Sequence, residues 1–322
     1  MNLKSPTGEE KEISQFLFDY IGKLGFNVQL QEVTIGRFNI FAQKGKPRVV
    51  LSTHMDTVSP FIPQSEDDDF IYGRGACDAK GIIAAQIKAG EKLIQNGFKN
   101  FGLLFIVGEE GTSDGALKAN QLKNSCQFLI NGEPTDNKMA LGSKGSLRVQ
   151  IRTQGKAAHS AYPDEGESAI LKMMYILQDF QNTEFPEHKI LGKTTFNIGT
   201  ISGGTQANVI PDAASSQLMF RVVSNLRDLK RKIKAIVRDR AEIQYISGCE
   251  PILLETLEGF KTMVASFTTD VPYLSNWGKP FLIGPGSIMD AHSSSERIKK
   301  SELKKAVTIY SNIVKRFLKD RK

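Results

Sequence analysis

The chain has 322 residues, of which 40% are hydrophobic and 24% are charged. This length exceeds the usual size of a single domain, so we expect two domains with a core large enough to need no disulfide or structural metal. A bound metal would therefore serve chemistry rather than folding.

The excess of basic residues, 42 Lys and Arg against 35 Asp and Glu, gives a net charge of +7. Much of it lies in two stretches, Arg227–Arg240 and Lys299–Lys322, where charged residues alternate with apolar ones at helical spacing. This pattern is typical of the solvated face of an amphipathic helix. No aromatic or glycine-rich recognition pattern accompanies the charge, so we expect no nucleic-acid partner.

The three cysteines, Cys77, Cys126 and Cys249, form no C-x-x-C pair, and their odd number argues against a disulfide framework. The segment Met1–Glu12 is polar and lacks the apolar core of a secretory signal. We find no run of about 18 apolar residues that could cross a membrane. We therefore expect a cytoplasmic protein without a membrane partner.

In chain order, the first half predicts a helix, a strand, a helix and two further strands: Glu9–Lys23, Val49–Thr53, Gly81–Gln95, Leu103–Val107 and Phe128–Ile130. Strands that alternate with helices indicate a largely parallel sheet flanked by helices, which is an α/β domain.

From about Ser146 the pattern changes to half-exposed strands with alternating polarity. We predict a strand, a helix, two strands, a basic helix and a strand: Leu147–Arg152, Ser168–Phe180, Thr195–Ile201, Ser216–Val222, Arg227–Arg240 and Glu242–Ser247. This β-α-β-β-α-β order indicates a ferredoxin-like antiparallel sheet with both helices on one face. We therefore expect a catalytic α/β domain at 1–145 and 254–322, interrupted by a smaller α+β domain at 146–253.

Histidine and acidic residues stand where predicted strands or glycine turns end. They are His54, Asp78, the pair Glu109 and Glu110, and Glu133, and His292 adds a second imidazole near the end of the chain. Each alone is more often a turn former than a ligand. The carboxyl ends of strands in an α/β sheet line the crevice where ligands bind, so several such residues together predict one site.

Imidazole and carboxylate are the ligands of catalytic zinc. Two histidines and three carboxylates suffice for two ions if one carboxylate bridges, and ions about 3.5–4 Å apart can hold a hydroxide and polarise a carbonyl group. One of Glu109 and Glu110 would then bind metal and its neighbour would act as general base. Asp56 is placed to accept the second N–H of His54.

Several motifs in order give the chain its resemblance to a known family. They are His54-x-Asp56, Gly73-Arg74-Gly75-x-x-Asp78, Glu109-Glu110, Glu133-Pro134, Gly284-Pro285-Gly286 and Ala291-His292. The chain resembles the zinc aminoacylase and carboxypeptidase family that includes acetylornithine deacetylase and succinyl-diaminopimelate desuccinylase. The resemblance covers nearly the whole chain.

The resemblance implies a role for each residue of the site. Asp78 would bridge two zinc ions per subunit, with His54 and Glu133 on one ion. Glu110 and His292 would bind the other ion, and Glu109 would be the general acid and base. Cobalt or manganese could bind the same ligands.

For the inserted domain, the resemblance implies a homodimer. His159 would reach the partner subunit's site and stabilise the oxyanion, and Asn208 would help to hold the substrate. Arg221 would pair with a substrate carboxylate as a bidentate fork. Lys144 and Gly286 complete the predicted substrate-binding residues. The strand before the basic helix, or that helix itself, is the expected dimer surface.

The chain departs from the family pattern in two places. The family usually carries a further helix before the segment that matches Ser5–Glu9, and an acidic residue is common at the position of Ser295. Ser295 would alter the support of His292.

The sequence therefore predicts a dinuclear-metal hydrolase in which a metal-bound water cleaves the amide bond of an N-acyl amino acid. The segment from Gly284 to His292 favours the acetylornithine deacetylase branch, and thus a deacetylase of amino-acid biosynthesis. A dipeptidase or aminopeptidase, or a desuccinylase, with the same site is the alternative enzyme. A metal-binding scaffold without catalysis is the alternative outside enzymes.

Overall fold

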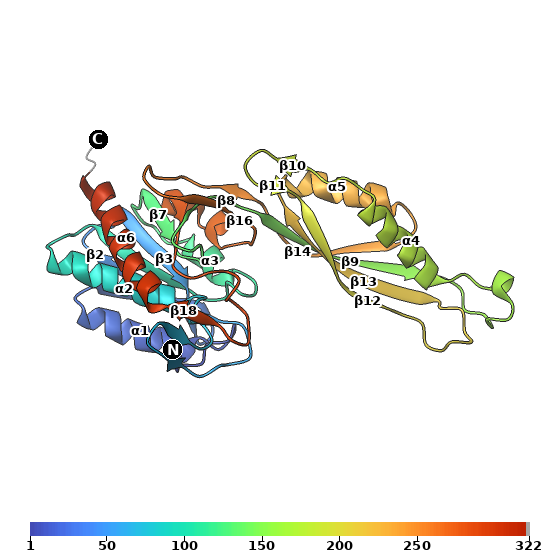
Figure 1. Ribbon diagram of the computed structural model, residues 1–322, viewed down its shortest axis with the longest axis horizontal. Coiled ribbons are helices and arrows are strands. Elements are labelled where there is room, and N and C mark those ends of the chain that lie inside the picture. Colours follow the sequence, from blue (N-terminus) through green and yellow to red (C-terminus); the bar gives the residue numbers. More distant parts are fainter. Residues whose placement is uncertain (320–322) are drawn as a thin grey trace. The chain divides into compact units, whose positions relative to one another are not determined.

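The structure, a computed structural model, describes residues 1–319 and divides into two compact units (Figure 1). Unit 1 consists of Met1–Leu141, Leu254–Met263 and Thr269–Lys322, and unit 2 of Gly142–Leu253 and Val264–Thr268. Unit 2 also includes Val264–Thr268, which lies outside the predicted inserted domain. This segment forms hydrogen bonds with residues at the start of unit 2. Lys144 N donates to Ala265 O at 2.9 Å, and Ser143 Oγ donates to Phe267 O at 2.5 Å.

Unit 1 is built on a six-stranded sheet of order β1-β2-β6-β3-β7-β17. The strands are β1 (Asn27–Thr34), β2 (Arg37–Lys44), β3 (Val49–His54), β6 (Phe101–Ile106), β7 (Phe128–Asn131) and β17 (Lys279–Leu282). The four strands from β6 to β17 run parallel, and β1 and β2 extend the sheet as an antiparallel hairpin. The predicted α/β class with a mostly parallel sheet is confirmed.

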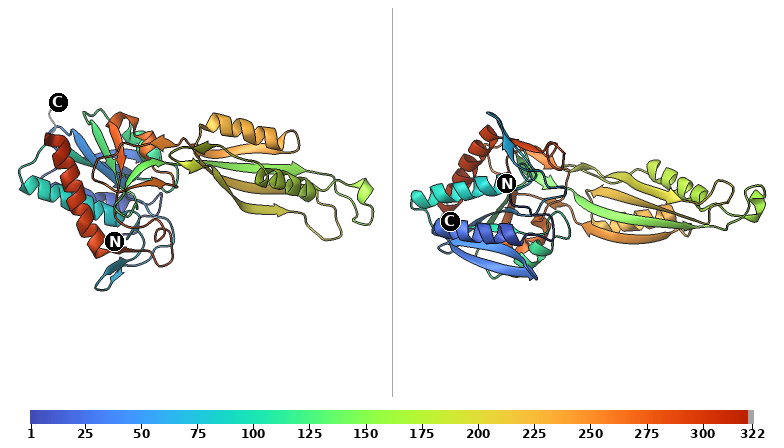
Figure 2. Two further views of the ribbon diagram at one scale, coloured as in Figure 1. Left: turned by 45° about the horizontal axis from the view of Figure 1, so that its top comes forward. Right: turned by 90° about the horizontal axis from the view of Figure 1, so that it is seen from below.

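Helices cover both faces of this sheet (Figures 1 and 2). On one face, α1 (Lys11–Lys23), α2 (Lys80–Gln95) and α6 (Lys300–Lys319) bury an apolar core against β3 and β6. On the other face, α3 (Asp114–Ala119) packs with η2 (Val271–Tyr273), η3 (Ser275–Trp277) and the buried Trp277. The sheet edge at the carboxyl ends of the parallel strands is thereby held in a rigid frame.

The remaining elements of the chain are short. A three-stranded sheet joins β18 (Arg297–Lys299), β5 (Phe70–Tyr72) and β4 (Ser65–Glu66), and another joins β15 (Ile252–Leu253), β8 (Met139–Ser143) and β16 (Thr262–Ala265). The first of these brings the segment after His292 beside the segment before Asp78, and no sequence pattern predicted this pairing.

Unit 2 contains a four-stranded antiparallel sheet of order β12-β13-β9-β14. Its elements follow the predicted β-α-β-β-α-β order: β9 (Gly145–Gln154), α4 (Ala169–Gln181), β12 (Thr195–Gly203), β13 (Ala213–Val222), α5 (Leu226–Val237) and β14 (Glu242–Cys249). The short strands β10 (Glu187–His188) and β11 (Gly192–Lys193) and the turn η1 (Pro163–Glu165) complete it.

Polar caps explain where the two helices of unit 2 begin, and apolar faces explain how they pack on the sheet. The Ser168 side chain accepts a hydrogen bond from Leu171 N at the start of α4, and Asn225 accepts one from Asp228 N at the start of α5. Both helices bury apolar residues in one core with the sheet. The basic residues of α5 lie on its outer side, as predicted for a solvated amphipathic helix.

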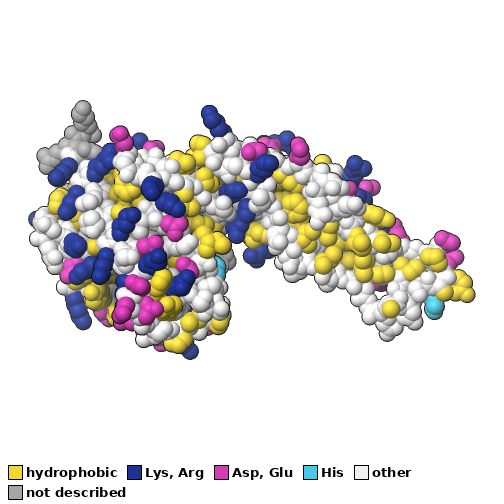
Figure 3. Space-filling model, viewed as in Figure 1, with side chains coloured by type: hydrophobic (Ala, Val, Ile, Leu, Met, Phe, Trp, Pro, Cys, Tyr) yellow, Lys and Arg dark blue, Asp and Glu magenta, His cyan; other side chains and the backbone are white. Residues whose placement is uncertain are grey.

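Charged residues of both signs are spread over the visible surface. On the face shown in Figure 3, Lys and Arg are interspersed with Asp and Glu, without a continuous basic surface on this face. None of the helices within residues 1–319 combines the length and the apolar composition needed to span a bilayer. The C-terminal helix was predicted to Lys322, and its last three residues lie outside the described part of the chain.

Candidate metal centre

The predicted ligands of unit 1 come from neighbouring strand ends. β3 ends at His54, Glu109 and Glu110 follow β6, and Glu133 follows β7. Because β6, β3 and β7 are adjacent and parallel, their carboxyl ends meet at one edge of the sheet. The chain after β17 returns to this edge with His292.

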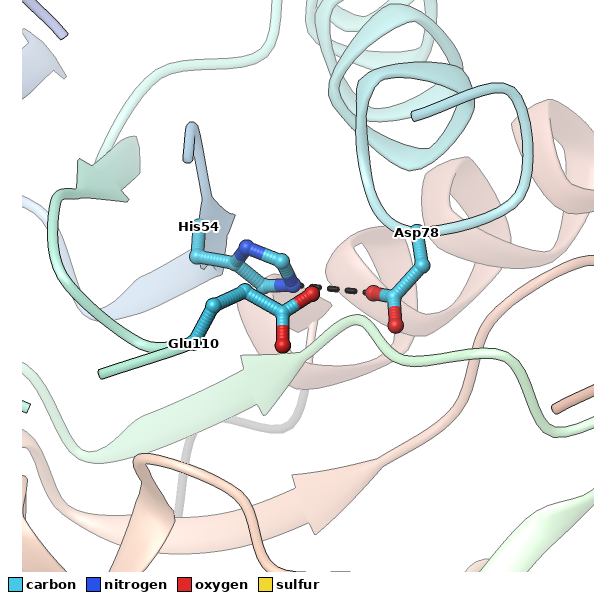
Figure 4. A group of neighbouring side chains, drawn as sticks. All are labelled: His54, Asp78 and Glu110. Carbon is cyan, nitrogen blue, oxygen red and sulfur yellow. Dashed lines mark hydrogen bonds and ion pairs between the residues drawn. The ribbon is translucent and has the colours of Figure 1, made fainter. Parts of the chain in front are cut away.

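Asp78 lies at the centre of this group, just before α2 (Figure 4). Its Oδ1 is 2.9 Å from Nε2 of His54, and its Oδ2 is 3.4 Å from Nε2 of His292. Nε2 of His292 is also 2.7 Å from Oε1 of Glu110. Each oxygen of one carboxylate therefore faces a different imidazole, which is the arrangement that a bridging ligand requires.

Asp56 fixes both His54 and the turn that carries the two glutamates. Nδ1 of His54 is 3.0 Å from the main-chain oxygen of Asp56 and 3.5 Å from its Oδ1. The Asp56 carboxylate accepts hydrogen bonds from the main-chain N–H groups of Glu109 and Glu110, each at 3.1 Å, and from Thr7 Oγ1 at 2.7 Å. The sequence analysis placed Asp56 as the acceptor of this N–H, and its main-chain oxygen is the nearer acceptor. The support of the Glu109-Glu110 turn was not predicted.

Burial and neighbouring charges shift the proton affinities of this cluster, and the two histidines lower the pKa of Asp78. Burial raises the pKa of Glu109 well above its usual value, and the neighbouring Glu133 raises it further. Burial likewise raises the pKa of Glu133. The carboxylates of Asp78 and Glu110 raise the pKa of His292 to about 10. Since the carboxyl groups of this cluster outnumber its imidazoles, His54 and His292, the cluster attracts cations.

The residues present fit divalent metal ions. One ligand atom from each of His54, Asp78 and Glu110 lies within 4.8 Å of the others (Figure 4). Oε1 of Glu133 is buried and has no hydrogen-bond partner in the described part of the chain, so it is available as a ligand. Imidazole nitrogen and carboxylate oxygen are the donors that zinc, cobalt and manganese accept.

Asp270 is an acidic residue near this cluster that the sequence analysis missed. It immediately precedes η2, is 1% exposed, and lies beside the side chain of Ser113. Burial raises its pKa to about 7, and its charge also raises the pKa of Glu109 and Glu133. No strand end or glycine turn marks Asp270, so the signal that identified the other residues was absent.

His159 and Asn208, the predicted contributions of unit 2 to catalysis, lie side by side. His159 forms an isolated antiparallel bridge with Val209, and Ser160 N donates to Asn208 O at 3.0 Å. Both side chains are exposed. They lie in loops that extend the pairing of β9 with β13 beyond the sheet.

Arg221 and Lys144 lie at the opposite end of unit 2. Arg221 is paired with Ser146 at the start of β9, whereas Ala213 is paired with Gln154 at its end. At a rise of about 3.3 Å per residue, these two pairs lie about 26 Å apart. Nη1 of Arg221 is 3.4 Å from Thr268 Oγ1, and Nζ of Lys144 donates to Lys193 O at 2.7 Å.

Gly286, the last predicted substrate-binding residue, lies beside Cys77 in unit 1. Its φ is +84°, and a Cβ there would meet the Cys77 sulfur at 2.6 Å. Glycine is required at this position for two reasons, the backbone conformation and the close contact. The structure thus gives Gly286 a role in packing beside Asp78, and its contact with substrate stays a prediction.

We predict that Asp56→Asn lowers turnover by about 10- to 100-fold, because the NH₂ group of the amide would face the N–H group of either Glu109 or Glu110, where the carboxylate accepts both. Steady-state kinetics with metal analysis would measure the effect. Thr7→Val is the matched control, since it removes only one hydrogen bond to the same carboxylate and should cost much less. Equal activity of the two variants would contradict this role of Asp56.

Comparison with known proteins places the chain in a family. A family model described as a peptidase dimerisation domain matches residues 141–244. A tripeptidase from Staphylococcus aureus has a similar fold, with a TM-score of 0.82 at 21% identity over 98% of this chain and 95% of that one. A probable carboxypeptidase of Aspergillus clavatus is 33% identical over 99% of this chain and 87% of its own length.

A peptidase M20 domain-containing protein of Schizosaccharomyces pombe is 38% identical over 98% of this chain and 82% of its own length. The matched region extends through both units. The chain therefore belongs to the M20 family of metallopeptidases and is a hydrolase.

Proposed function

We propose that the protein hydrolyses the amide bond of an N-acyl amino acid at a centre of two divalent metal ions. The division of the two Asp78 oxygens between His54 and His292 is the observation that carries this proposal. A carboxylate so placed can bridge two ions, with Glu133 completing one ligand set and Glu110 the other. We propose zinc as the ion, with cobalt and manganese as substitutes.

Glu109 is the proposed general base and acid. The ions that these residues would hold would supply Lewis acidity toward the scissile carbonyl and toward water. Glu109 accepts a proton from the attacking water and delivers it to the leaving amine. Its raised pKa favours this exchange, because a proton carrier works best when its pKa is near the working pH.

Arg221 is the proposed partner of the substrate carboxylate. Its guanidinium group is half-buried, and no carboxylate forms an ion pair with it in the described part of the chain. A buried guanidinium group without an anion favours a ligand that brings one. An N-acyl amino acid and the C-terminal residue of a peptide both carry a carboxylate next to the scissile amide.

The substrate class follows from this shared chemistry. The segment from Gly284 to His292 favours an acetylated amino acid, such as acetylornithine. The Aspergillus clavatus relative is named a probable carboxypeptidase, and the Staphylococcus aureus protein a tripeptidase. A dipeptidase or carboxypeptidase is therefore the second candidate, since the same carboxylate and amide would bind in the same way.

A small substrate cannot contact His159 and Arg221 of the same unit 2, because these residues lie at opposite ends of β9. We therefore propose a homodimer in which His159 and Asn208 act at the partner subunit's metal centre. The match of residues 141–244 to a dimerisation domain supports this arrangement.

We place the dimer surface on α4 and the edge strand β12. The outer side of α4 exposes Leu171, Met174 and Tyr175, and Figure 3 shows hydrophobic side chains gathered over this helix. β12 has an unpaired edge, which can add strands from a second copy. The strand before the basic helix, β13, is paired on both sides, and α5 exposes charged residues, so neither of the elements expected from the sequence suits this contact.

Two parts of the proposal rest on the sequence. The cytoplasmic location follows from the cysteine pattern, and no disulfide joins cysteines within residues 1–319. Retention of Glu109 and of all candidate ligands argues for an enzyme rather than a metal-binding scaffold.

We predict that acetyl amino acids with a free carboxylate are hydrolysed about 10- to 100-fold faster, in kcat/KM, than the same compounds with a carboxamide, because Arg221 loses a charge-assisted contact. A panel of acetyl and succinyl amino acids, dipeptides and their carboxamides would measure this preference. Arg221→Ala should remove the preference, and Arg152→Ala, on the same sheet, should retain it. A preference unchanged in Arg221→Ala would contradict this role.

We predict that Glu109→Gln retains two metal ions per chain but lowers kcat by about 100- to 10,000-fold, because it removes proton transfer and no ligand. Metal analysis and kinetics on the same samples would show both effects. Glu110→Gln is the contrasting variant and should lose metal. Normal turnover by Glu109→Gln would show that another group moves the proton.

We predict that mixing inactive Glu109→Gln protein with inactive His159→Ala protein restores about a quarter of the wild-type activity, because half of the randomly paired dimers contain one intact site. Mass spectrometry would confirm subunit exchange, and each variant alone is the control. No recovery after confirmed exchange would rule out the shared site.

A further inference from the structure

Glu296 is a buried carboxylate that binds the main chain of the loop ending at Asp78. It is 1% exposed, and its Oε1 accepts hydrogen bonds from the N–H groups of Cys77 and Asp78, each at 3.0 Å. Its Oε2 accepts one from Nη1 of Arg74 at 2.7 Å. All three of these hydrogen-bond donors belong to the segment 74–78.

A second set of contacts holds Glu296 in place. β18 pairs with β5 in the register Arg297 to Tyr72, and Gly73 N donates to Glu296 O at 3.0 Å. Arg74 is 2% exposed, and its Nε also donates to Pro60 O at 3.1 Å. Glu296 thus holds the loop 74–78 by hydrogen bonds to its main chain and to the Arg74 side chain, a set of contacts called the clamp below.

The clamp links the two segments that carry ligands. Glu296 fixes the main-chain N–H of Asp78, and the side chain of the same residue faces both histidines. His292 belongs to the same short segment as Glu296. A displacement of Glu296 would therefore move Asp78 and His292 relative to each other.

We infer that Glu296 is a positioning residue that holds Asp78 in the geometry needed to bridge two metal ions, and that this carboxylate sets the affinity of the centre for metal. The inference rests on the proposed function. It assigns to the site a residue, Glu296, that itself binds no ion and contacts no substrate.

The chemistry of the carboxylate explains why a neutral substitute would fail. An amide offers one acceptor oxygen in place of two, and its NH₂ group would face either Arg74 or the N–H groups of Cys77 and Asp78. Arg74 would then lose its buried anion. Loss of such supporting groups typically costs metal sites about 10- to 100-fold in affinity.

An exposed ion pair on the same segment provides a matched control. Nε of Arg297 lies 3.3 Å from Oδ1 of Asp290, and both side chains are partly exposed, at 44% and 34%. Exposed pairs of this kind contribute little to stability. Arg297→Gln therefore changes the charge next to Glu296 without touching the Asp78 loop.

The test is titration of the full-length apoprotein with Co²⁺, in competition with a chelator and followed by visible absorption. We expect Glu296→Gln to lower Co²⁺ affinity by about 10- to 100-fold and to change the absorption of the bound ion, which reports ligand geometry. Arg297→Gln should leave both measurements unchanged. Thermal unfolding of the apoproteins would show that the variants are folded.

A folded Glu296→Gln protein with wild-type affinity and spectrum would overturn the inference while leaving the proposed function intact. Failure of the unmodified protein to bind Co²⁺ would contradict both. If Glu296→Gln does not fold, Arg74→Lys decides the matter, because lysine keeps the charge but lacks the guanidinium geometry. A folded Arg74→Lys protein with unchanged affinity and spectrum would equally overturn the inference.

Discussion

The site depends on an excess of buried negative charge at one edge of a parallel sheet. Burial and repulsion between carboxylates raise the pKa of Glu109 and Glu133, whereas His54 and His292 lower the pKa of Asp78, which lies between them. Such a cluster is stable when protons or metal ions neutralise it. The fold supplies the cluster because adjacent parallel strands all end at this edge, so residues distant in sequence must meet there.

The supporting residues matter as much as the candidate ligands. The main-chain oxygen of Asp56 orients His54, and its carboxylate holds the Glu109-Glu110 turn. Glu296 holds the loop of Asp78. Each is a buried carboxylate that accepts main-chain N–H groups. Buried carboxylates that would bind the proposed ions are therefore backed by two others, Asp56 and Glu296, which fix the main chain behind them.

Sequence reasoning predicted the candidate ligands because each follows a local signal, an apolar run or glycine turn that ends in His, Asp or Glu. It predicted an inserted domain because strand alternation changes near Ser146. It could not find the clamp by Glu296, since the register of β18 on β5 depends on tertiary contacts across the chain. The same holds for Asp270 and for Val264–Thr268, whose places depend on packing rather than on any local pattern.

The length of β9 has a consequence for how this protein can change over time. The strand separates His159 from Arg221 by a nearly fixed distance, and β13 runs beside it in register. Inserting two residues into both strands would lengthen that separation by about 7 Å while preserving which side chains face the core. An insertion of one residue would reverse the faces of the sheet. Coupled changes in two strands can therefore alter how far the loop of His159 extends from the rest of its own unit while the core of the sheet is preserved.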